Sequence, residues 1–415
     1  MRQTTVLVIG GGQAGLAMSH SLSARHIDHV VLERGQVGER WRRHGWDSLR
    51  LLTPNWMTRL PGFAYRGPDP DGFMPTAELV TMLEQYAASS RVPIETRTTV
   101  RRVEPCGDGF RVTTERGQWR ADAVVIATGY CDRPAIPRLS ARLASWVLQL
   151  APDGYRHPEQ LPRDGVLIVG ASSSGVQLAD EIQQSGRQVT LAVGRHTRLP
   201  RRYRGRDILW WLDRLGVLAQ EASTVHDLAI SRAQPSLQLV GRPDHSTVDL
   251  TTLHARGVLL TGRVRGIDGT RVELADDLIA RTAAADLKLA TIRTRIDEYV
   301  RRSGVEADDP EPFVPTWSVA AHPVSRLDLR RDRIGTVIWA TGYRRVYRWL
   351  HVPVLDRHGE IMHDGGITTY PGLYVLGLNF QRRRNSSFID GVGRDAVELA
   401  RHIAAAVAPL RQRYA

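Results

Sequence analysis

Three glycines near the start of the chain have the spacing of a turn that binds phosphate groups. Gly10, Gly12 and Gly15 follow the apolar run VLVI and precede a helix-like pattern. In such a turn the first glycine permits a tight bend, the second lets the backbone approach a pyrophosphate, and the third lets helix and strand pack closely. The start of the helix offers unpaired N–H groups to the phosphates. The spacing therefore predicts a dinucleotide site, and Glu33, at the end of the next strand, is the expected acceptor for ribose hydroxyls.

A second turn of this kind lies in the stretch VLIVGASSSGVQLADEI. It retains Gly170 and Gly175 but has Ser172 at the middle position. A serine fits there if the phosphates lie slightly farther out, and the hydroxyls of Ser172, Ser173 and Ser174 add hydrogen-bond donors. The stretch therefore predicts a second dinucleotide site in the same chain.

The residues after the following strand distinguish the two predicted sites. Where Glu33 stands in the first unit, the second has Gly194 and Arg195. An acid repels a ribose 2′-phosphate, whereas an arginine forms strong charge-assisted bonds with it. The first site therefore suits FAD and the second suits NADPH, and two such sites indicate cofactors that exchange electrons. Three further arginines are expected to contribute to the phosphate site, unless they form a solvated cluster: Arg198, Arg201 and Arg202.

Composition excludes several other classes of protein. The chain has 415 residues, 42% of them hydrophobic, which predicts two or three domains with substantial cores. The net charge of +12 comes from arginines spread along the whole chain, with Lys288 as the lone lysine, so no nucleic-acid partner is expected. Cys106 and Cys131 are the two cysteines and form no CxxC pair, which argues against a disulfide framework, a metal site and a dithiol relay.

No segment reads as a secretion leader or as a membrane span, because no apolar stretch approaches about 20 residues. We therefore expect a cytoplasmic protein. The sequence is compatible with a homo-oligomer. The stretch ILWWLDRLGVL has apolar residues at helical spacing. It is typical of packing onto its own domain, with a substrate-channel wall or a membrane contact as alternatives.

The order of the elements predicts an α/β fold with two Rossmann-like domains. The expected FAD-binding domain is discontinuous, with residues 1–160 as its first part and 331–415 as its second. The inserted NADPH-binding domain, with its helical insert, covers 161–330. Two strands end in the sequence ATG, and each precedes a point where the chain is expected to pass from one domain to the other. The expected helices cover 76–88, 208–218, 283–302 and 391–408, and an antiparallel run covers 95–119.

This order of motifs resembles the flavin-containing monooxygenases, and most closely their bacterial flavoprotein and plant YUCCA-type branch. The resemblance covers nearly the whole chain and is weakest across 210–325. The matching stretches are GERWRRHGWDSLRLLTPNW, LPGF, ATGYCDRPAIP, GRHTRLPRRYRGRD, ATGYR and the C-terminal GLYVLGLNF with FIDGVGRDA.

The resemblance implies a specific chemistry. NADPH reduces FAD, O2 adds at flavin C4a, and the resulting (hydro)peroxyflavin transfers one oxygen atom to a small organic substrate. This chain departs from the family signature FxGxxxHxxxY, because Ala151 stands at the position of the histidine and only Tyr155 is retained. The alternatives are therefore a flavin-dependent dehydrogenase or oxidase without oxygen insertion, and a non-catalytic redox sensor.

The resemblance also implies site residues. Tyr155, Asn55 and Thr53 are the candidates for catalysis, and Val100 is expected to bond the adenine through its backbone. A helix that begins near Asp390 is expected to direct its positive end at the flavin. The other expected cofactor-binding residues are Gln13, Ala14, Arg34, Arg40, Trp41, Ala127, Thr128, Gly129, Ala340, Thr341, Gly342, Gly377 and Asn385. No metal site is expected.

Overall fold

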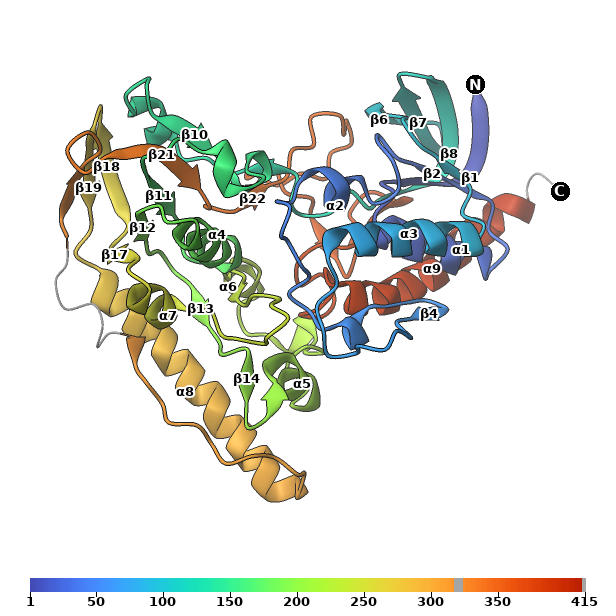
Figure 1. The fold of residues 1–415 in the computed structure, drawn as a ribbon. Coiled ribbons are helices and arrows are strands. Elements are labelled where there is room, and N and C mark those ends of the chain that lie inside the picture. The colour runs from blue at the N-terminus through green and yellow to red at the C-terminus, as the bar shows by residue number, and fades with distance from the viewer. Residues whose placement is uncertain (317–323, 413–415) are drawn as a thin grey trace.

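The computed structural model describes residues 1–316 and 324–412 and contains two α/β units (Figure 1). The first unit contains the N-terminus and the last helix, and the second is formed by the middle of the chain. The sheet of the second unit is parallel throughout, and the sheet of the first unit has parallel central strands with antiparallel strands added to them.

The first unit contains a nine-stranded sheet with the order β23-β24-β25-β8-β1-β2-β5, and β6 and β7 continue from β8. The long strand β1 pairs in parallel with β2 and β8, and β8 pairs in parallel with β25. The residues that follow these strands therefore meet at one edge of the sheet. The strands are β1 (Arg2–Ile9), β2 (His29–Leu32), β5 (Ile94–Glu95), β6 (Val100–Cys106), β7 (Gly109–Thr114), β8 (Gly117–Ile126), β23 (His363–Asp364), β24 (Ile367–Thr368) and β25 (Leu373–Val375).

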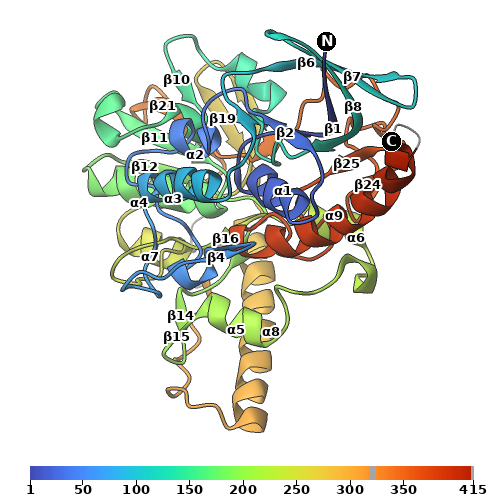
Figure 2. The same cartoon turned by 90° about the vertical axis from the view of Figure 1, so that its right-hand side faces the viewer.

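Both faces of this sheet are covered, which explains the unbroken apolar run in β1. Val6 and Val8 pack against the helices α1 (Gln13–Ser23), α3 (Thr76–Ser89) and α9 (Ile389–Gln412) (Figure 2). Leu7 and Ile9 point to the other face, where they pack against residues of the β6–β7 hairpin. The predictions of a helix at 76–88, an antiparallel run at 95–119 and a C-terminal helix are confirmed.

The second unit repeats this arrangement. Its sheet has the order β10-β21-β11-β12-β17, with all neighbours parallel. One face packs against α4 (Ser173–Gln184) and α7 (Leu250–Ala255), and the other against a three-stranded antiparallel sheet. The strands are β10 (Leu148–Leu150), β11 (Gly165–Val169), β12 (Val189–Ala192), β17 (Leu259–Thr261), β21 (Ile334–Trp339), and in the antiparallel sheet β18 (Val264–Asp268), β19 (Arg271–Leu274) and β20 (Arg326–Asp328).

The chain crosses between the units on two strands that pair with each other, β9 (Arg133–Pro134) and β22 (Tyr343–Arg344). The predicted domain limits at 160/161 and 330/331 are therefore wrong, because β10 and β21 both belong to the second sheet. The physical reason is the internal repeat. β21 and its ATG sequence lie beside β11 as β8 and its ATG sequence lie beside β1.

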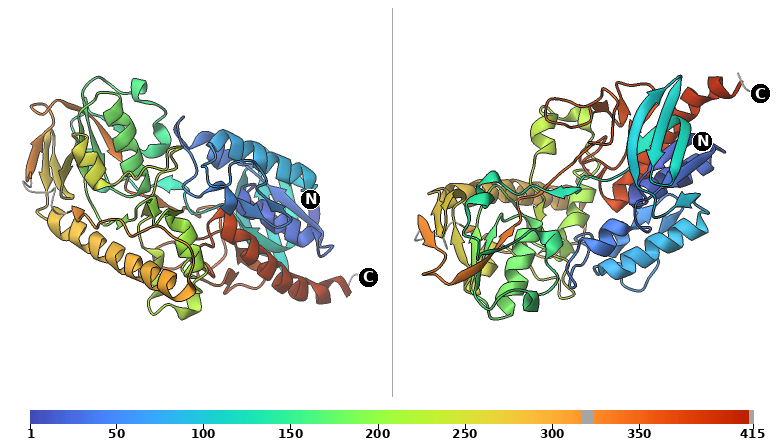
Figure 3. Two further views of the ribbon diagram at one scale, coloured as in Figure 1. Left: turned by 60° about the horizontal axis from the view of Figure 1, so that its bottom comes forward. Right: turned by 90° about the horizontal axis from the view of Figure 1, so that it is seen from above.

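The insert of the second unit forms an arm (Figures 1 and 3). Its longest helix, α8 (Leu278–Ser303), extends away from the sheet, and the chain returns alongside it. Helices predicted near 208–218 and 283–302 are confirmed, although α5 (Ile208–Arg214) is short because Gly216 follows with φ +69°. Trp211 of α5 is fully buried, so packing onto its own domain is confirmed for that residue.

The remaining helices and strands are short. They are α2 (Glu39–Arg43), α6 (Leu228–Arg232), β3 (Arg59–Leu60), β4 (Phe63–Ala64), β13 (Thr197–Arg198), β14 (Arg202–Tyr203), β15 (Arg206–Asp207), β16 (Leu237–Gln238) and the 3-10 helices Asn55–Met57, Arg138–Arg142, Pro152–Gly154, Pro158–Gln160 and Ala222–Thr224. Within the described part of the chain, no helix has both the length and the apolar character that a membrane crossing requires.

Candidate functional site

The first glycine turn joins β1 to α1 and has a separate steric reason for each glycine. Gly10 has φ +114°, and a Cβ there would lie 2.5 Å from the carbonyl oxygen of Ala127. A Cβ on Gly15 would lie 1.8 Å from the carbonyl oxygen of Gly10. A Cβ on Gly12 meets no protein atom within 4 Å. Protein packing therefore explains Gly10 and Gly15, whereas Gly12 has the geometry of a position that a pyrophosphate approaches.

Glu33 is held against this turn by backbone donors. Its carboxylate accepts hydrogen bonds from the N–H of Gly11 at 2.6 Å and from the N–H of Gly35 at 2.8 Å, and the residue is 8% exposed. Each carboxylate oxygen accepts more than one bond, so ribose hydroxyls can still be bound. Gly11 was missed by the sequence analysis, although the run of three glycines was its signal. A Cβ there would lie 2.9 Å from Cβ of Glu33.

Several other predicted residues gather beside the first turn. The indole N–H of Trp41 donates to Gln13 Oε1 at 3.2 Å, which places α2 against the start of α1. Arg40 donates to the carbonyl of Asp132 at 2.8 Å, and Arg34 lies 3.8 Å from the carboxylate of the same aspartate. Both arginines therefore border the crossing between the units.

The loops after β8, β5 and β25 complete this edge of the sheet. Gly377 has φ +84°, and a Cβ there would lie 2.8 Å from Cβ of Ala14 at the start of α1. Gly129 has φ +77° and follows Thr128, which is exposed. Val100 begins the strand two residues after Thr98, whose N–H donates to the carbonyl of Glu33 at 2.8 Å.

The second turn has the same geometry as the first. Gly170 has φ +108°, and a Cβ there would lie 2.3 Å from the carbonyl oxygen of Ala340. A Cβ on Gly175 would lie 1.9 Å from the carbonyl oxygen of Gly170. Ser172 occupies the N-cap of α4 with extended backbone and no capping bond from its side chain. Its hydroxyl is therefore not engaged at the helix start, where a phosphate is expected.

The other polar residues at the second turn differ in whether they bond to other protein groups. Ser173 is 7% exposed, and its hydroxyl accepts a hydrogen bond from Gln177 at 3.0 Å, whereas Ser174 is half-buried. Thr341 donates to the carbonyl of Ala135 at 2.9 Å in the crossing, and Gly342 has φ +87°.

The strand register corrects one comparison between the two sites. Leu32 pairs with the last residue of β1, and Ala192 pairs with the last residue of β11. The counterpart of Glu33 is therefore Val193, and not the pair Gly194 and Arg195 that the sequence comparison placed there. Val193 is fully buried, so the second site has no acid at this position.

Arg195 follows two residues after Val193 and is exposed. It makes no hydrogen bond or ion pair with any residue that the structure describes. Its guanidinium is therefore free to pair with a phosphate at the edge of the second sheet.

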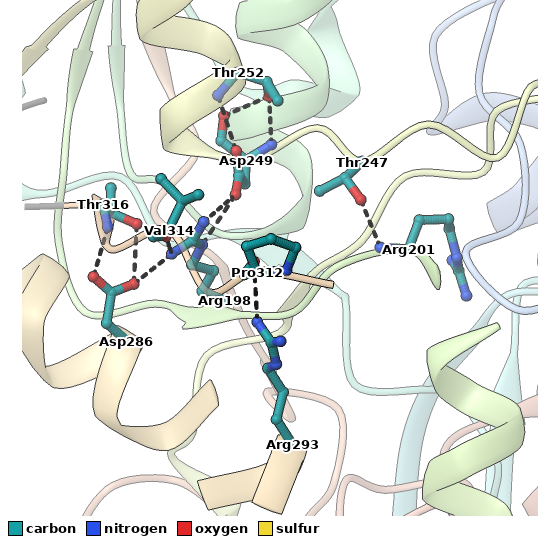
Figure 4. Close-up of polar contacts among 10 residues, drawn as sticks. All are labelled: Arg198, Arg201, Thr247, Asp249, Thr252, Asp286, Arg293, Pro312, Val314 and Thr316. Carbon is teal, nitrogen blue, oxygen red and sulfur yellow. Dashed lines mark hydrogen bonds and ion pairs between the residues drawn. The ribbon is translucent and has the colours of Figure 1, made fainter. Parts of the chain in front are cut away.

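The expectation that Arg198 and Arg201 contribute to a phosphate site is wrong for both side chains, and Figure 4 shows the ion pairs of Arg198. Arg198 forms ion pairs with Asp249 at 2.9 Å and Asp286 at 2.7 Å, and its side chain is 9% exposed. Arg201 is 1% exposed and pairs with Asp207 at 2.6 Å. Burial explains the error, because a guanidinium inside the protein must be neutralised by the protein's own carboxylates.

Arg202, the third arginine, has a different environment. It is exposed and donates to the carbonyl of Gly205 in the β14–β15 hairpin. This bond leaves part of its guanidinium free, but it directs the side chain along its own hairpin.

Two buried asparagines lie in the segments that face the second unit. Asn55 donates to the carbonyl of Asp69 at 2.9 Å, and Asn385 lies 3.5 Å from the carboxylate of Asp390. The side-chain oxygens of both asparagines are buried and have no partner among the described residues. Asp390 lies in the first turn of α9 and forms an ion pair with Arg59. An unpaired buried acceptor is costly, so each amide oxygen is a candidate contact for a bound group.

The three arginines before α9 are half-buried, and their side chains are paired. Arg383 forms an ion pair with Asp395 at 2.9 Å, and Arg382 lies 3.2 Å from Glu398. Arg384 donates to Gln220 at 2.8 Å. These bonds attach the loop to α9 and to the second unit. The side-chain oxygen of Asn385, in the same loop, has no partner among the described residues.

Tyr155 lies in the core of the second unit and not beside the two asparagines. It is fully buried, and its hydroxyl donates to Glu181 on α4 at 3.1 Å. Burial and the neighbouring carboxylate raise the pKa of this phenol far above its usual range. The structure therefore gives Tyr155 a structural role in place of the expected catalytic one.

We expect Tyr155→Phe to lower the free energy of unfolding by about 1–2 kcal/mol, because one buried hydrogen bond to a carboxylate is lost. The rate of flavin reduction by the nicotinamide coenzyme should stay within about twofold of wild type, which corresponds to about 0.4 kcal/mol, because the hydroxyl bonds Glu181 in the core. Chemical denaturation and rapid-mixing absorbance measure the two quantities. A large loss of reduction rate at unchanged stability would restore a catalytic role.

Comparison with known proteins agrees with this geometry. The sequence pattern of the pyridine nucleotide-disulphide oxidoreductase family matches residues 7–216, which include both glycine turns. A CzcO-like oxidoreductase from Geobacillus kaustophilus is 32% identical over 96% of this chain and 97% of its own length. The chain belongs to the pyridine nucleotide-disulphide oxidoreductase family. It is an FAD-dependent oxidoreductase, and its cofactors are an FAD-type flavin and a pyridine nucleotide.

Within this family, the resemblance to flavin-containing monooxygenases is confirmed. Indole-3-pyruvate monooxygenase YUCCA1 of Oryza sativa subsp. japonica is 25% identical over 96% of this chain and 90% of its own length. A flavin-containing monooxygenase from Stenotrophomonas maltophilia has the same fold, with a TM-score of 0.68 and 22% identity over 98% of this chain and all of that protein. The predicted α/β class with two Rossmann-type units is thereby confirmed.

Proposed function

We propose that this protein is an NADPH- and FAD-dependent monooxygenase that inserts one atom of O2 into a small organic substrate. The observation that carries the proposal is the pair of equivalent glycine turns with different ribose-binding ends. The first turn has the anchored carboxylate of Glu33, and the second has buried Val193 followed by the unpaired Arg195. A free ribose suits the first end and a 2′-phosphate suits the second.

The residues at the first turn fit an FAD-type group. The backbone N–H groups at the start of α1 bind its pyrophosphate, and Gly12 leaves room for the close approach. Glu33 would accept the ribose hydroxyls, and the unpaired amide oxygens of Asn55 and Asn385 would serve as further hydrogen-bond acceptors for the bound group. Bound flavin supplies the electron transfer and the oxygen activation.

The remaining residues orient the coenzyme and exclude water. The N–H groups at the start of α4 bind the nicotinamide coenzyme's pyrophosphate, and Arg195 binds its 2′-phosphate. Leu52, Trp56 and Phe388 of the first unit pack into one apolar cluster with residues of the second unit. This cluster excludes water from the seam between the units, as oxygen transfer requires.

The cysteines argue against disulfide reduction, which the family name includes. Cys106 and Cys131 are both free, and burial raises the pKa of the Cys131 thiol. A raised pKa disfavours the reactive thiolate. One observation favours a second candidate, a dehydrogenase or oxidase: Ala151, at the position of the signature histidine, is 7% exposed and carries no polar group.

The test is isotope incorporation from 18O2. The protein with FAD and NADPH is incubated with a panel of amines, sulfides, ketones and aromatic compounds, and products are analysed by mass spectrometry. One 18O atom per product molecule is expected. NADPH oxidation that gives only hydrogen peroxide would establish the second candidate, and a purified protein that binds no FAD would overturn both.

A further inference from the structure

A segment of the first unit, residues 51–55, is held by two residues of the second unit. This segment contains Thr53 and Asn55, the candidate residues for the flavin side of the site. Its own unit bonds it through the N–H of Leu51 to Met74 and through the N–H of Asn55 to Gly72, both at 2.9 Å. The carbonyls of Leu51 and Leu52 face the second unit.

Arg201 of the second unit binds this segment directly. Its guanidinium donates to the carbonyl of Leu52 at 2.8 Å and to Asp207 at 2.6 Å, and it lies 4.8 Å from the centre of the Phe73 ring. Asp207 also caps α5 by accepting from the N–H of Leu209 at 2.8 Å. The guanidinium is thus fixed from three sides, so it determines where the Leu52 carbonyl lies.

The second holding residue is Gly241. A Cβ there would lie 2.1 Å from the carbonyl oxygen of Leu51 and 2.9 Å from Cβ of Phe73. The backbone of the second unit therefore approaches the segment so closely that no other residue fits. Gly241 and Arg201 therefore contact the carbonyls of two consecutive residues, Leu51 and Leu52.

We propose that Arg201 is a positioning residue that sets the place of Thr53 and Asn55 beside the flavin. The flavin side of the site is then complete only with the second unit in contact. The Arg201–Asp207 pair is buried at this contact, where removing one partner leaves the other charge uncompensated. The proposal rests on the proposed function in one respect, that residues 53–55 border the flavin.

The test compares Arg201→Lys with Arg198→Lys in the FAD-loaded full-length protein. Both arginines are buried and paired with carboxylates in the same unit, but Arg198 makes no contact with residues 51–55 among the described contacts. A lysine cannot donate to Leu52 and Asp207 in the fixed fork of an arginine. Gly241→Ala displaces the same segment from its other side and serves as the second variant.

Two readouts are measured, and neither needs turnover. Hydrogen exchange at the amides of Leu51 and Asn55 should become about tenfold faster in Arg201→Lys and Gly241→Ala, and stay within about twofold in Arg198→Lys. Quenching of flavin fluorescence by iodide should rise about twofold in the same two variants, with the FAD content unchanged.

Equal exchange in the Arg201 and Arg198 variants would overturn the proposal. Faster exchange without any change in flavin quenching would also overturn it, because the segment would then not border the flavin. Failure of oxygen transfer by the wild-type protein would contradict the proposed function alone, since both readouts are independent of the reaction.

Discussion

Gly12→Ala is expected to lower the affinity for FAD by about 100-fold, or about 2.7 kcal/mol, while the apoprotein folds as before. The added Cβ meets no protein atom within 4 Å, and the backbone of Gly12 has φ −87°. Alanine at this N-cap changes helix stability by only about 0.5 kcal/mol. The methyl group therefore acts on whatever approaches the start of α1. Titration of the apoprotein with FAD, followed by flavin fluorescence, measures the affinity.

Two companion variants separate binding from folding. Gly15→Ala places a Cβ 1.8 Å from the carbonyl of Gly10 and should destabilise the protein itself. Gly154→Ala is the matched control, because its nearest contact is an ordinary 3.6 Å to Leu150. Wild-type FAD affinity in Gly12→Ala, with Gly154→Ala unchanged, would remove the first turn as the flavin site.

Arg195→Asp is expected to weaken the preference for NADPH over NADH. We expect kcat/KM for NADPH to fall by about 100-fold, since a guanidinium–phosphate pair is replaced by a repulsion. The value for NADH should change by less than about threefold, because that coenzyme has no 2′-phosphate to lose. Steady-state kinetics with both coenzymes measure the ratio, and the FAD content should be unchanged because Arg195 belongs to the second unit.

Arg202→Asp is the matched control for this change of charge. Arg202 is also exposed, but its guanidinium donates to Gly205 within its own hairpin. We expect it to alter the preference by less than about threefold. An unchanged preference in Arg195→Asp, or an equal effect of both variants, would show that the 2′-phosphate is recognised elsewhere.

The parts of the site that could be predicted are those whose requirements are local. Gly10 and Gly15 are needed by contacts of the turn with its own strand and helix, and the spacing alone expresses this need. The buried strand before each ATG sequence and the helix at Thr76–Ser89 are likewise set by short-range patterns of apolar residues. The sheet topology and the fold of known relatives confirmed these predictions.

The arginines show where local patterns are insufficient. Arg195, Arg198, Arg201 and Arg202 look alike in the sequence, yet two are buried with carboxylates from Asp249, Asp286 and Asp207. Asp249 and Asp286 stand 51 and 88 residues from Arg198, and Asp207, six residues from Arg201, reaches it only because the chain folds back in the β14–β15 hairpin. The same limit applies to Tyr155. Its partner Glu181 lies on α4, and only the packing of this helix brings the two side chains together.

The amino-acid sequence by itself determined that this chain has two dinucleotide turns, each with its own strand and helix, because steric rules for glycine act within a few residues. Only the tertiary structure decided that β21 completes the second sheet, that Val193 replaces Glu33, and that Arg201 holds residues 51–55. Each of these depends on register or on burial. Register arises from pairing between strands that are far apart in the sequence. Burial decides the role of Arg201, because removing a charge from water is costly unless the charge is paired.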